Sequence, residues 1–149
     1  ASVGLTPYLG PCIVVDALGD GDTVSADEVL PKLDAIDSVA ERVLIRTFTT
    51  FPARDWPVHF RGLSPDLIER LGERGCRLIG TDAPSIDPES SKTLDAHHCV
   101  RRFGMAILEG LVLDQVAAGE YELIALPLPL ANADASPVRA VLRRLNAER

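Results

Sequence analysis

The feature that most constrains the fold is an alternation of short apolar runs with amphipathic stretches. Residues 12–15, 43–45 and 78–80 are apolar runs, rich in Val and Ile, of the kind that forms buried strands. Between them, the stretches that begin near residues 25 and 64 place their apolar side chains at helical spacing. Because apolar strands then alternate with amphipathic helices, the chain favours an α/β or α+β fold.

Helix starts are marked by capping residues at three places. Ser25 followed by Glu28 fits a capping box, in which each side chain satisfies a free backbone N–H of the other residue. The Ser-Pro pair at 64–65 combines a capping hydroxyl with proline at the first helical position. The same pair at 136–137 predicts a C-terminal helix, and the late arginines would then favour the negative end of its dipole.

Weaker patterns complete the expected element order. We expect a short helix over 93–101, strands over 106–108 and 121–128, and an irregular loop over 49–62. The chain shows no internal repeat, low-complexity stretch or long charged run. We therefore assign residues 1–149 to one domain.

Composition and charge argue against several classes of protein. The net charge of −7 disfavours electrostatic binding to nucleic acid, whose phosphates would be repelled. No apolar run reaches the roughly 18 residues of a membrane span, and no signal segment opens the chain. Cys12, Cys76 and Cys99 show no C-x-x-C spacing, so neither a disulfide framework nor a zinc ribbon is expected. We expect reduced, mostly buried cysteines in a cytoplasmic protein without nucleic-acid or membrane partners.

His97 and Glu109 are the first candidates for a metal site, although their spacing of twelve residues is a weak signal. The alternative is a hydrogen-bonded histidine beside a surface carboxylate. Glu109 stands inside an apolar run, which indicates partial burial and therefore a cation or metal partner. Three arginines are alternative partners for this carboxylate: Arg77, Arg101 and Arg102.

Other polar residues have both a functional and an ordinary interpretation. Asp82 follows a strand, a common place for function in α/β folds, and its role stays open. Asp87 fits a helix or turn cap better than a site residue. Asp95 either orients a histidine or is solvated. His59 fits a packed or exposed loop residue, and Ser85 lacks the G-x-S-x-G context of a serine nucleophile.

Six segments follow one another along nearly the whole chain: YLGPC (8–12), LIGTDAPSIDP (78–88), SKTLDAH (91–97), MAILEGL (105–111), YELIALPL (121–128) and DASPVRA (134–140). Together they resemble the bacterial kynurenine formamidases, a family of metal-dependent cyclase-like enzymes. The central segment, LIGTDAPSIDP, resembles the family's L-x-G-x-D-x-P-S-x-D pattern, and MAILEGL resembles its I-L-E-G-L/I run. Each segment alone is weak, but the combination is specific.

The resemblance implies a fold and an activity. The expected fold is a single mixed α/β domain with a barrel-like sheet and flanking helices, assembled as a homodimer. Members hydrolyse N-formyl-L-kynurenine to L-kynurenine and formate in tryptophan breakdown. The aromatic substrate needs an apolar pocket, for which the loop over 48–60 is the candidate wall.

The resemblance also implies site residues and a cofactor. The family binds zinc or another divalent ion such as manganese, often as a pair. His97 and Glu109 match two of its ligands, and His97 matches better than His98 because it directly follows Asp-Ala. Asp95 is the expected partner that orients His97.

One family motif, H-x-G-[TA]-H-x-D-x-P, does not occur in this sequence. The motif carries most of the metal ligands and the expected proton-transferring histidine, so the catalytic residue stays unknown. A zinc site needs about four ligands, and His97 with Glu109 supplies two. Since the first residue is Ala1, we expect a C-terminal portion that lacks the N-terminal metal-binding segment and is inactive alone. The alternatives are an inactive homologue, a same-fold amidase for another substrate, and a non-catalytic dimerisation or binding domain.

Overall fold

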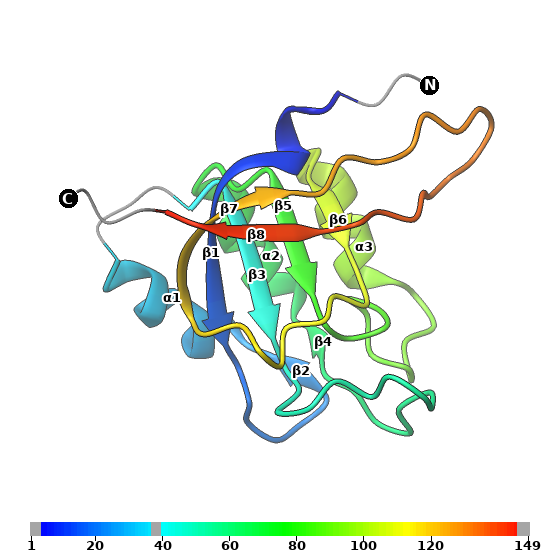
Figure 1. The fold of residues 1–149 in the computed structure, drawn as a ribbon. Helices are drawn as coiled ribbons and strands as arrows, with labels where there is room; N and C mark the ends of the chain where they lie inside the picture. Colours follow the sequence, from blue (N-terminus) through cyan, green and yellow to red (C-terminus); the bar gives the residue numbers. More distant parts are fainter. Residues whose placement is uncertain (1–3, 37–39, 146–149) are drawn as a thin grey trace.

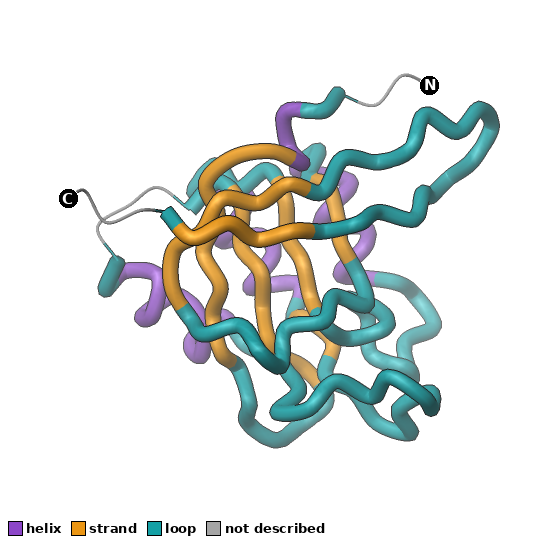
Figure 2. Tube along the Cα trace, viewed as in Figure 1, coloured by secondary structure: helices purple, strands orange, loops and turns teal. Residues whose placement is uncertain are grey.

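The computed structural model describes residues 4–36 and 40–145, which form a curled mixed sheet with helices on one side (Figures 1 and 2). The helical segments are η1 (Thr6–Tyr8), α1 (Ala26–Asp34), α2 (Pro65–Glu73) and α3 (Asp95–Phe103). The strands are β1 (Leu9–Asp16), β2 (Thr23–Val24), β3 (Arg42–Arg46), β4 (Gly62–Leu63), β5 (Leu78–Thr81), β6 (Ala106–Leu108), β7 (Gly119–Ile124) and β8 (Val141–Arg144).

The main sheet has the strand order β6-β5-β3-β1-β7-β8. The first four strands in this order are parallel. The segments that contain α1, α2 and α3 each carry the chain back to the end of the sheet at which the preceding strand began. β7 and β8 join the sheet antiparallel. β2 and β4 form a separate parallel pair. The predicted α/β class with a mixed sheet and flanking helices is confirmed.

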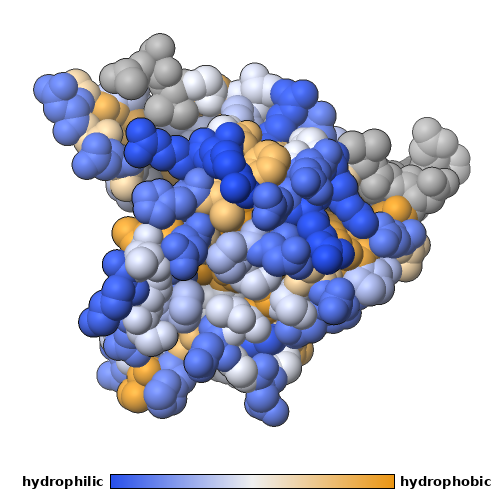
Figure 3. All heavy atoms as spheres, turned by 180° about the vertical axis from the view of Figure 1, so that it is seen from behind, coloured by the Kyte–Doolittle hydropathy of each residue, from blue (hydrophilic) through white to orange (hydrophobic). Residues whose placement is uncertain are grey.

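The parallel strands are buried on both faces, which explains their continuous apolar runs. In β3, Val43 and Ile45 belong to the core between sheet and helices, whereas Leu44 belongs to a second core on the opposite face. The outer surface of the molecule opposite to the view of Figure 1 carries mostly hydrophilic residues (Figure 3). The helices therefore cover one face of the sheet and direct their polar residues toward water.

The second core explains the barrel-like shape. β7 and β8 curl across the face of β3, β5 and β6 (Figure 1). Leu44 and Leu78 of the parallel strands consequently share one buried cluster with Tyr121 and Leu123 of β7. β6 and β8 remain the two edges of the curled sheet.

The helix starts at residues 25 and 64 agree with their capping signals. The backbone N–H of Ser25 donates to Glu28 Oε1 over 3.1 Å, and the N–H of Leu67 donates to Ser64 Oγ over 3.1 Å. β7 ends at Ile124, earlier than the predicted strand over 121–128. Prolines follow at 127 and 129, and they have no N–H to continue a ladder.

The predicted C-terminal helix after the Ser-Pro pair at 136–137 is wrong. β8 pairs antiparallel with β7 instead. Ser136 Oγ accepts the N–H of Leu128 over 2.8 Å across the connecting segment, so the hydroxyl caps no helix. Arg143 Nη2 lies 2.5 Å from Glu122 Oε2 on the neighbouring strand, so this arginine serves an ion pair between strands and not a helix dipole. Arg149 lies outside the described residues.

The three cysteines are free thiols, as predicted. Cys12 and Cys76 are buried, and Cys99 is partly buried. Burial raises the pKa of Cys12 to about 12 and that of Cys76 to about 11. In the described part of the chain, none of the helices has the length and apolar character needed to cross a membrane.

Candidate metal centre

The candidate site lies where the parallel strands end. β3, β5 and β6 run in the same direction, so the residues that follow their last positions lie together at the carboxyl ends of the strands (Figure 1). Thr47 follows β3, Asp82 follows β5 and Glu109 follows β6. In open α/β sheets, ligands usually bind beside the carboxyl ends of the strands.

Asp82 holds the start of the loop that follows β3. Its carboxylate is 1% exposed and accepts hydrogen bonds from the N–H and the hydroxyl of Thr47, over 2.8 and 2.7 Å. It also accepts the N–H of Phe48 over 3.0 Å. Burial raises the pKa of Asp82, and these hydrogen bonds oppose the shift. Asp82, whose role the sequence leaves open, therefore has a structural role in holding this loop.

Glu109 is placed by the turn that follows β6. Gly110 has a φ of +65°, and its N–H donates to Ala83 O over 2.9 Å. Glu109 Oε1 accepts the N–H of Ile86 over 2.9 Å. Glu109 is exposed as a residue, and its side chain is 32% exposed, so it is buried less than the apolar run around it indicates and is accessible to solvent.

His97 lies in the first turns of α3 and meets a carboxylate at each ring nitrogen. Its Nδ1 is 2.6 Å from Asp87 Oδ2, and its Nε2 is 3.5 Å from Glu109 Oε1. The two candidate ligands, twelve residues apart in sequence, therefore converge. The structure does not pair Glu109 with the arginines considered above: Arg77 pairs with Glu41 and Arg102 with Glu69.

Asp87 is a buried cap for α3, in line with the cap interpretation. Its carboxylate accepts the N–H groups of Ala96 and His97 over 3.0 and 3.1 Å. Burial opposes ionisation of Asp87, but the hydrogen bonds from the His97 ring and these N–H groups together hold its pKa below the ordinary value. The sequence offered no sign of the bond to the His97 ring.

Asp95 was the residue expected to orient His97. Its side chain is exposed at the start of α3. Both nitrogens of the His97 ring face other carboxylates, those of Asp87 and Glu109. The role of Asp95 stays a prediction, whereas Asp87 occupies the position that such a partner needs.

A cavity of about 380 Å³ adjoins Glu109, within the usual size of a small-molecule pocket. Most of its lining comes from the loop predicted as a pocket wall. The lining residues are Phe51, Pro52, Ala53, Arg54, Asp55, Trp56, Pro57, Asp82, Pro84, Glu109 and Gly110. Trp56 is 68% exposed and meets Phe60 edge-on, with 6.4 Å between ring centroids. His59 is exposed, one of the two alternatives foreseen for it.

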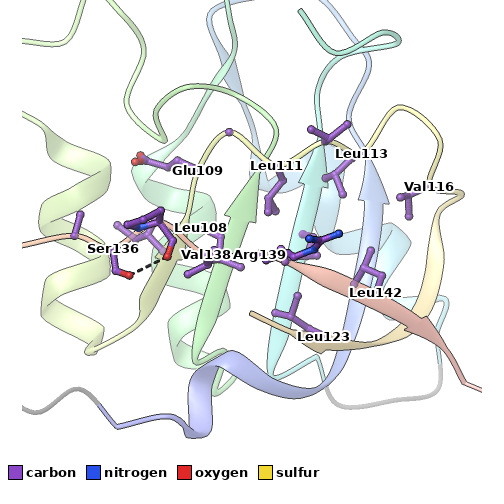
Figure 4. Close-up of a pocket in the computed structure, with 17 residues that line it drawn as sticks. Leu108, Glu109, Leu111, Leu113, Val116, Leu123, Ser136, Val138, Arg139 and Leu142 are labelled. Atoms are coloured by element: carbon purple, nitrogen blue, oxygen red, sulfur yellow. Dashed lines mark hydrogen bonds between the residues drawn. The ribbon is translucent and has the colours of Figure 1, made fainter. Parts of the chain in front are cut away.

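A second cavity of about 760 Å³ lies on the inner face of the curled sheet (Figure 4). Leu111, Leu113, Leu123 and Leu142 make much of its lining apolar. Glu109 and Gly110 line both cavities. In Figure 4, the Glu109 carboxylate is directed away from the labelled leucines, which fits its contacts with His97 and Ile86.

The donor set fits a divalent metal in part. Imidazole nitrogen and carboxylate oxygen are ordinary zinc ligands, and a metal-binding histidine usually has its other nitrogen hydrogen-bonded. Within residues 4–36 and 40–145, no group of three or more His, Cys, Asp or Glu side chains is arranged to hold a metal. His97 and Glu109 therefore fit as two ligands of a site that needs others.

Comparisons with known proteins agree with the resemblance found in the sequence. A family model described as "Putative cyclase" matches residues 1–88. The chain is 57% identical over 145 residues to kynurenine formamidase of Maricaulis maris (strain MCS10), covering 97% of this chain and 68% of that protein. It is 52% identical, over the same shares, to kynurenine formamidase of Sphingopyxis alaskensis. The chain thus spans about two thirds of the length of these relatives.

Solved structures with the same fold point to metal-dependent hydrolysis. One is described as a potential metal-dependent hydrolase with cyclase activity, with a TM-score of 0.81 and 29% identity over 93% of this chain and 67% of that chain. A second, a predicted metal-dependent hydrolase from Bacillus stearothermophilus, has a TM-score of 0.80 and 29% identity over 93% and 65%. These neighbours support a divalent metal and leave its identity open.

Proposed function

We propose, because this chain belongs to the Cyclase family, that it acts as a metal-dependent amidohydrolase on N-formyl-L-kynurenine. The products would be L-kynurenine and formate, in the breakdown of tryptophan. The observation that carries the proposal is the convergence of His97 Nε2 and Glu109 Oε1, 3.5 Å apart, beside a pocket with aromatic walls. Relatives named kynurenine formamidase support the choice of substrate.

His97 and Glu109 would hold the metal, for which we propose zinc, with two ions in a complete site. Nitrogen and carboxylate donors suit zinc and also manganese. A divalent cation at such a site supplies polarisation of the formyl carbonyl and a lower pKa for the attacking water. Since zinc needs about four ligands, further donors would complete the site in the active enzyme.

The chain's own residues would bind the substrate and keep its reacting bond near these ligands. Water adds to the formyl carbon, the C–N bond breaks, formate leaves and the aniline nitrogen takes up a proton. Phe51 and Trp56 offer apolar surface for the aniline ring. Arg54 and Asp55 place one positive and one negative side chain on the same lining, opposite in sign to the α-carboxylate and α-ammonium groups of the substrate.

Hydrolysis of N-formyl-L-kynurenine, with zinc supplied to the protein expressed from its complete gene, tests the proposal. We expect rapid production of kynurenine. His97→Ala and Glu109→Gln should each lower kcat/KM by more than about 100-fold and should also lower the zinc content. The loss of a metal ligand should cost more than the loss of a residue that only supports a ligand. His98→Ala is the matched control, because this exposed neighbour should leave activity unchanged.

Each other outcome selects one of the alternatives. Zinc binding without turnover of this substrate would keep the site and move the activity to another formamide or to a cyclic imide. Absence of both zinc binding and turnover would leave a non-catalytic binding domain. Stoichiometric zinc and full activity in His97→Ala would disprove the ligand assignment.

The pocket wall has its own test. Trp56→Ala should raise KM for N-formyl-L-kynurenine by roughly 10-fold, the effect of losing about 1.4 kcal/mol of aromatic contact, with a smaller change in kcat. Val58→Ala is the control, because Val58 is 76% exposed in the same loop and outside the pocket lining. Equal KM values for the two variants would place the substrate elsewhere.

We propose a homodimer, in line with the expectation from the sequence. The segment between β7 and β8 projects from the body of the molecule (Figure 1). Leu126, Leu128 and Leu130, at alternating positions of this segment, are 42–54% exposed. Exposed apolar rows of this kind mark contact surfaces. Light scattering should give twice the chain mass, and Leu128→Asp should lower it.

We also propose a cytoplasmic location. All three cysteines are free thiols, and unpaired cysteines are the rule in reducing compartments. Cell fractionation with an antibody against the protein tests this assignment, and recovery in the periplasm would contradict it.

A further inference from the structure

We propose that the turn over residues 85–88 positions both candidate metal ligands, with Asp87 as the positioning residue for His97. The inference rests on the proposed function, because it takes His97 and Glu109 as ligands. The turn touches the ligands from behind: one of its residues binds the histidine ring, and the adjacent residue binds the glutamate.

The Asp87 carboxylate takes part in three hydrogen bonds, one with the imidazole of His97 and two from backbone N–H groups at the start of α3. Oδ2 lies 2.6 Å from Nδ1 of the ring and 3.1 Å from the backbone N–H of His97, and Oδ1 accepts the N–H of Ala96. The Asp87 side chain is 4% exposed, so water hardly competes for these bonds. A carboxylate at Nδ1 keeps the proton there and leaves the lone pair on Nε2, which is the form that binds metal.

The neighbouring residue fixes the second ligand. The N–H of Ile86 donates to Glu109 Oε1 over 2.9 Å. Because Ile86 and Asp87 are adjacent in one turn, the spacing between the two ligands depends on the shape of that turn. The turn thus contacts both residues of the pair whose atoms His97 Nε2 and Glu109 Oε1 lie 3.5 Å apart, although α3 and the turn after β6 supply these residues separately.

The turn itself is held on two sides. Ser85 Oγ accepts the N–H of Asp87 over 3.1 Å, which closes the turn locally. On the other side, the N–H of Leu63 donates to Ile86 O over 2.6 Å. The turn packs so closely on β4 that a side chain at Gly62 would overlap Pro88. The turn is therefore a rigid support, as precise ligand placement requires.

Zinc affinity of the protein expressed from its complete gene, measured by competition with a chelator, tests the role of Asp87. Asp87→Asn should weaken zinc binding by roughly 10- to 100-fold, the usual effect of removing a partner of a metal-bound histidine. Glu89→Gln is the matched control, since Glu89 is an exposed carboxylate two residues after Asp87. The control should stay within about twofold of the wild-type affinity, the scale of ordinary surface substitutions.

A second readout separates positioning from helix capping. ¹⁵N NMR of the metal-free protein should show the His97 proton on Nδ1 in the wild type and in Glu89→Gln. In Asp87→Asn, the proton should shift toward Nε2. A lower melting temperature with an unchanged tautomer and unchanged zinc affinity would overturn the inference and leave Asp87 as a helix cap alone.

Two further variants keep the outcome decisive. If Asp87→Asn does not fold, Ser85→Ala loosens the turn while Asp87 stays in place, and it should still lower zinc affinity several-fold; no change would overturn the inference. His97→Ala distinguishes this failure from failure of the proposed function. Zinc affinity lost in His97→Ala but kept in Asp87→Asn would reject the positioning role only, whereas affinity kept in His97→Ala would reject the ligand assignment itself.

Discussion

Gly62→Ala should weaken both the fold and the metal site, because β4 packs directly against the turn over 85–88. A Cβ at Gly62 would lie 2.6 Å from Pro88 N, which is 0.8 Å short of the 3.4 Å at which ordinary contact begins. It would also lie 2.8 Å from Ile86 O, the acceptor for the N–H of Leu63. Since these are backbone atoms, no side-chain rotation can relieve the overlap.

The expected cost follows from these contacts. Overpacking of this kind costs about 1–3 kcal/mol, and a stretched Leu63–Ile86 hydrogen bond adds about 1 kcal/mol. Urea denaturation should therefore show a loss of about 2–4 kcal/mol in the free energy of unfolding. Zinc affinity should fall as well, because the displaced turn carries Ile86 and Asp87.

Gly4→Ala is the control for this prediction. No atom lies within 4 Å of the Cβ position at Gly4, so the unfolding free energy should stay within about 0.5 kcal/mol of the wild type. If Gly62→Ala matched this control in both stability and zinc affinity, the close packing of β4 on the turn would not support the site.

Two further predictions concern titratable groups. Cys99 should react with a thiol reagent in the native protein, whereas buried Cys12 and Cys76, whose pKa values are raised to about 12 and 11, should react only after unfolding; native labelling of all three would contradict their burial. The hydrogen bond from Arg61 lowers the pKa of Glu28 from 4.5 to about 2, against an opposing effect of burial and with help from hydrogen bonds from Ser25. The contribution of Glu28 to stability is therefore present above about pH 4.5 and lost as the pH falls through about 2. Glu28→Gln should flatten that part of the stability curve and cost about 1–2 kcal/mol at pH 7, a figure reduced for the one-third exposure of the side chain; an unchanged acid limb would refute the assignment.

Local sequence signals predicted most of the secondary structure for physical reasons. Capping at Ser25 and Ser64 depends on hydrogen bonds within three residues, so the pattern and the structure coincide. The Ser-Pro pair at 136–137 carries the same signal, but the helix that it predicts does not form. There the chain meets β7, and pairing with a distant strand outweighs a local helix preference.

The candidate site divides in the same way. His97 and Glu109 were found through the family resemblance, because their own spacing carries little information. The sequence around Asp87 indicates only a cap, although its carboxylate also binds the histidine ring ten residues later. Hydrophobic periodicity cannot reveal this contact, because a loop separates the turn that holds Asp87 from the start of the helix that holds His97.

By itself, the sequence determined the α/β class, the positions of most helices and strands, and the residue types available for a metal site. These properties follow from hydrophobic periodicity and capping, which act between near neighbours in the chain. Only the tertiary structure decided that β8 is a strand, that the pocket lined by residues 51–57 lies beside Glu109, and that the turn over 85–88 contacts both ligands. The reason is physical: each of these features depends on contacts between segments that the folded sheet, and not the order of residues, brings together.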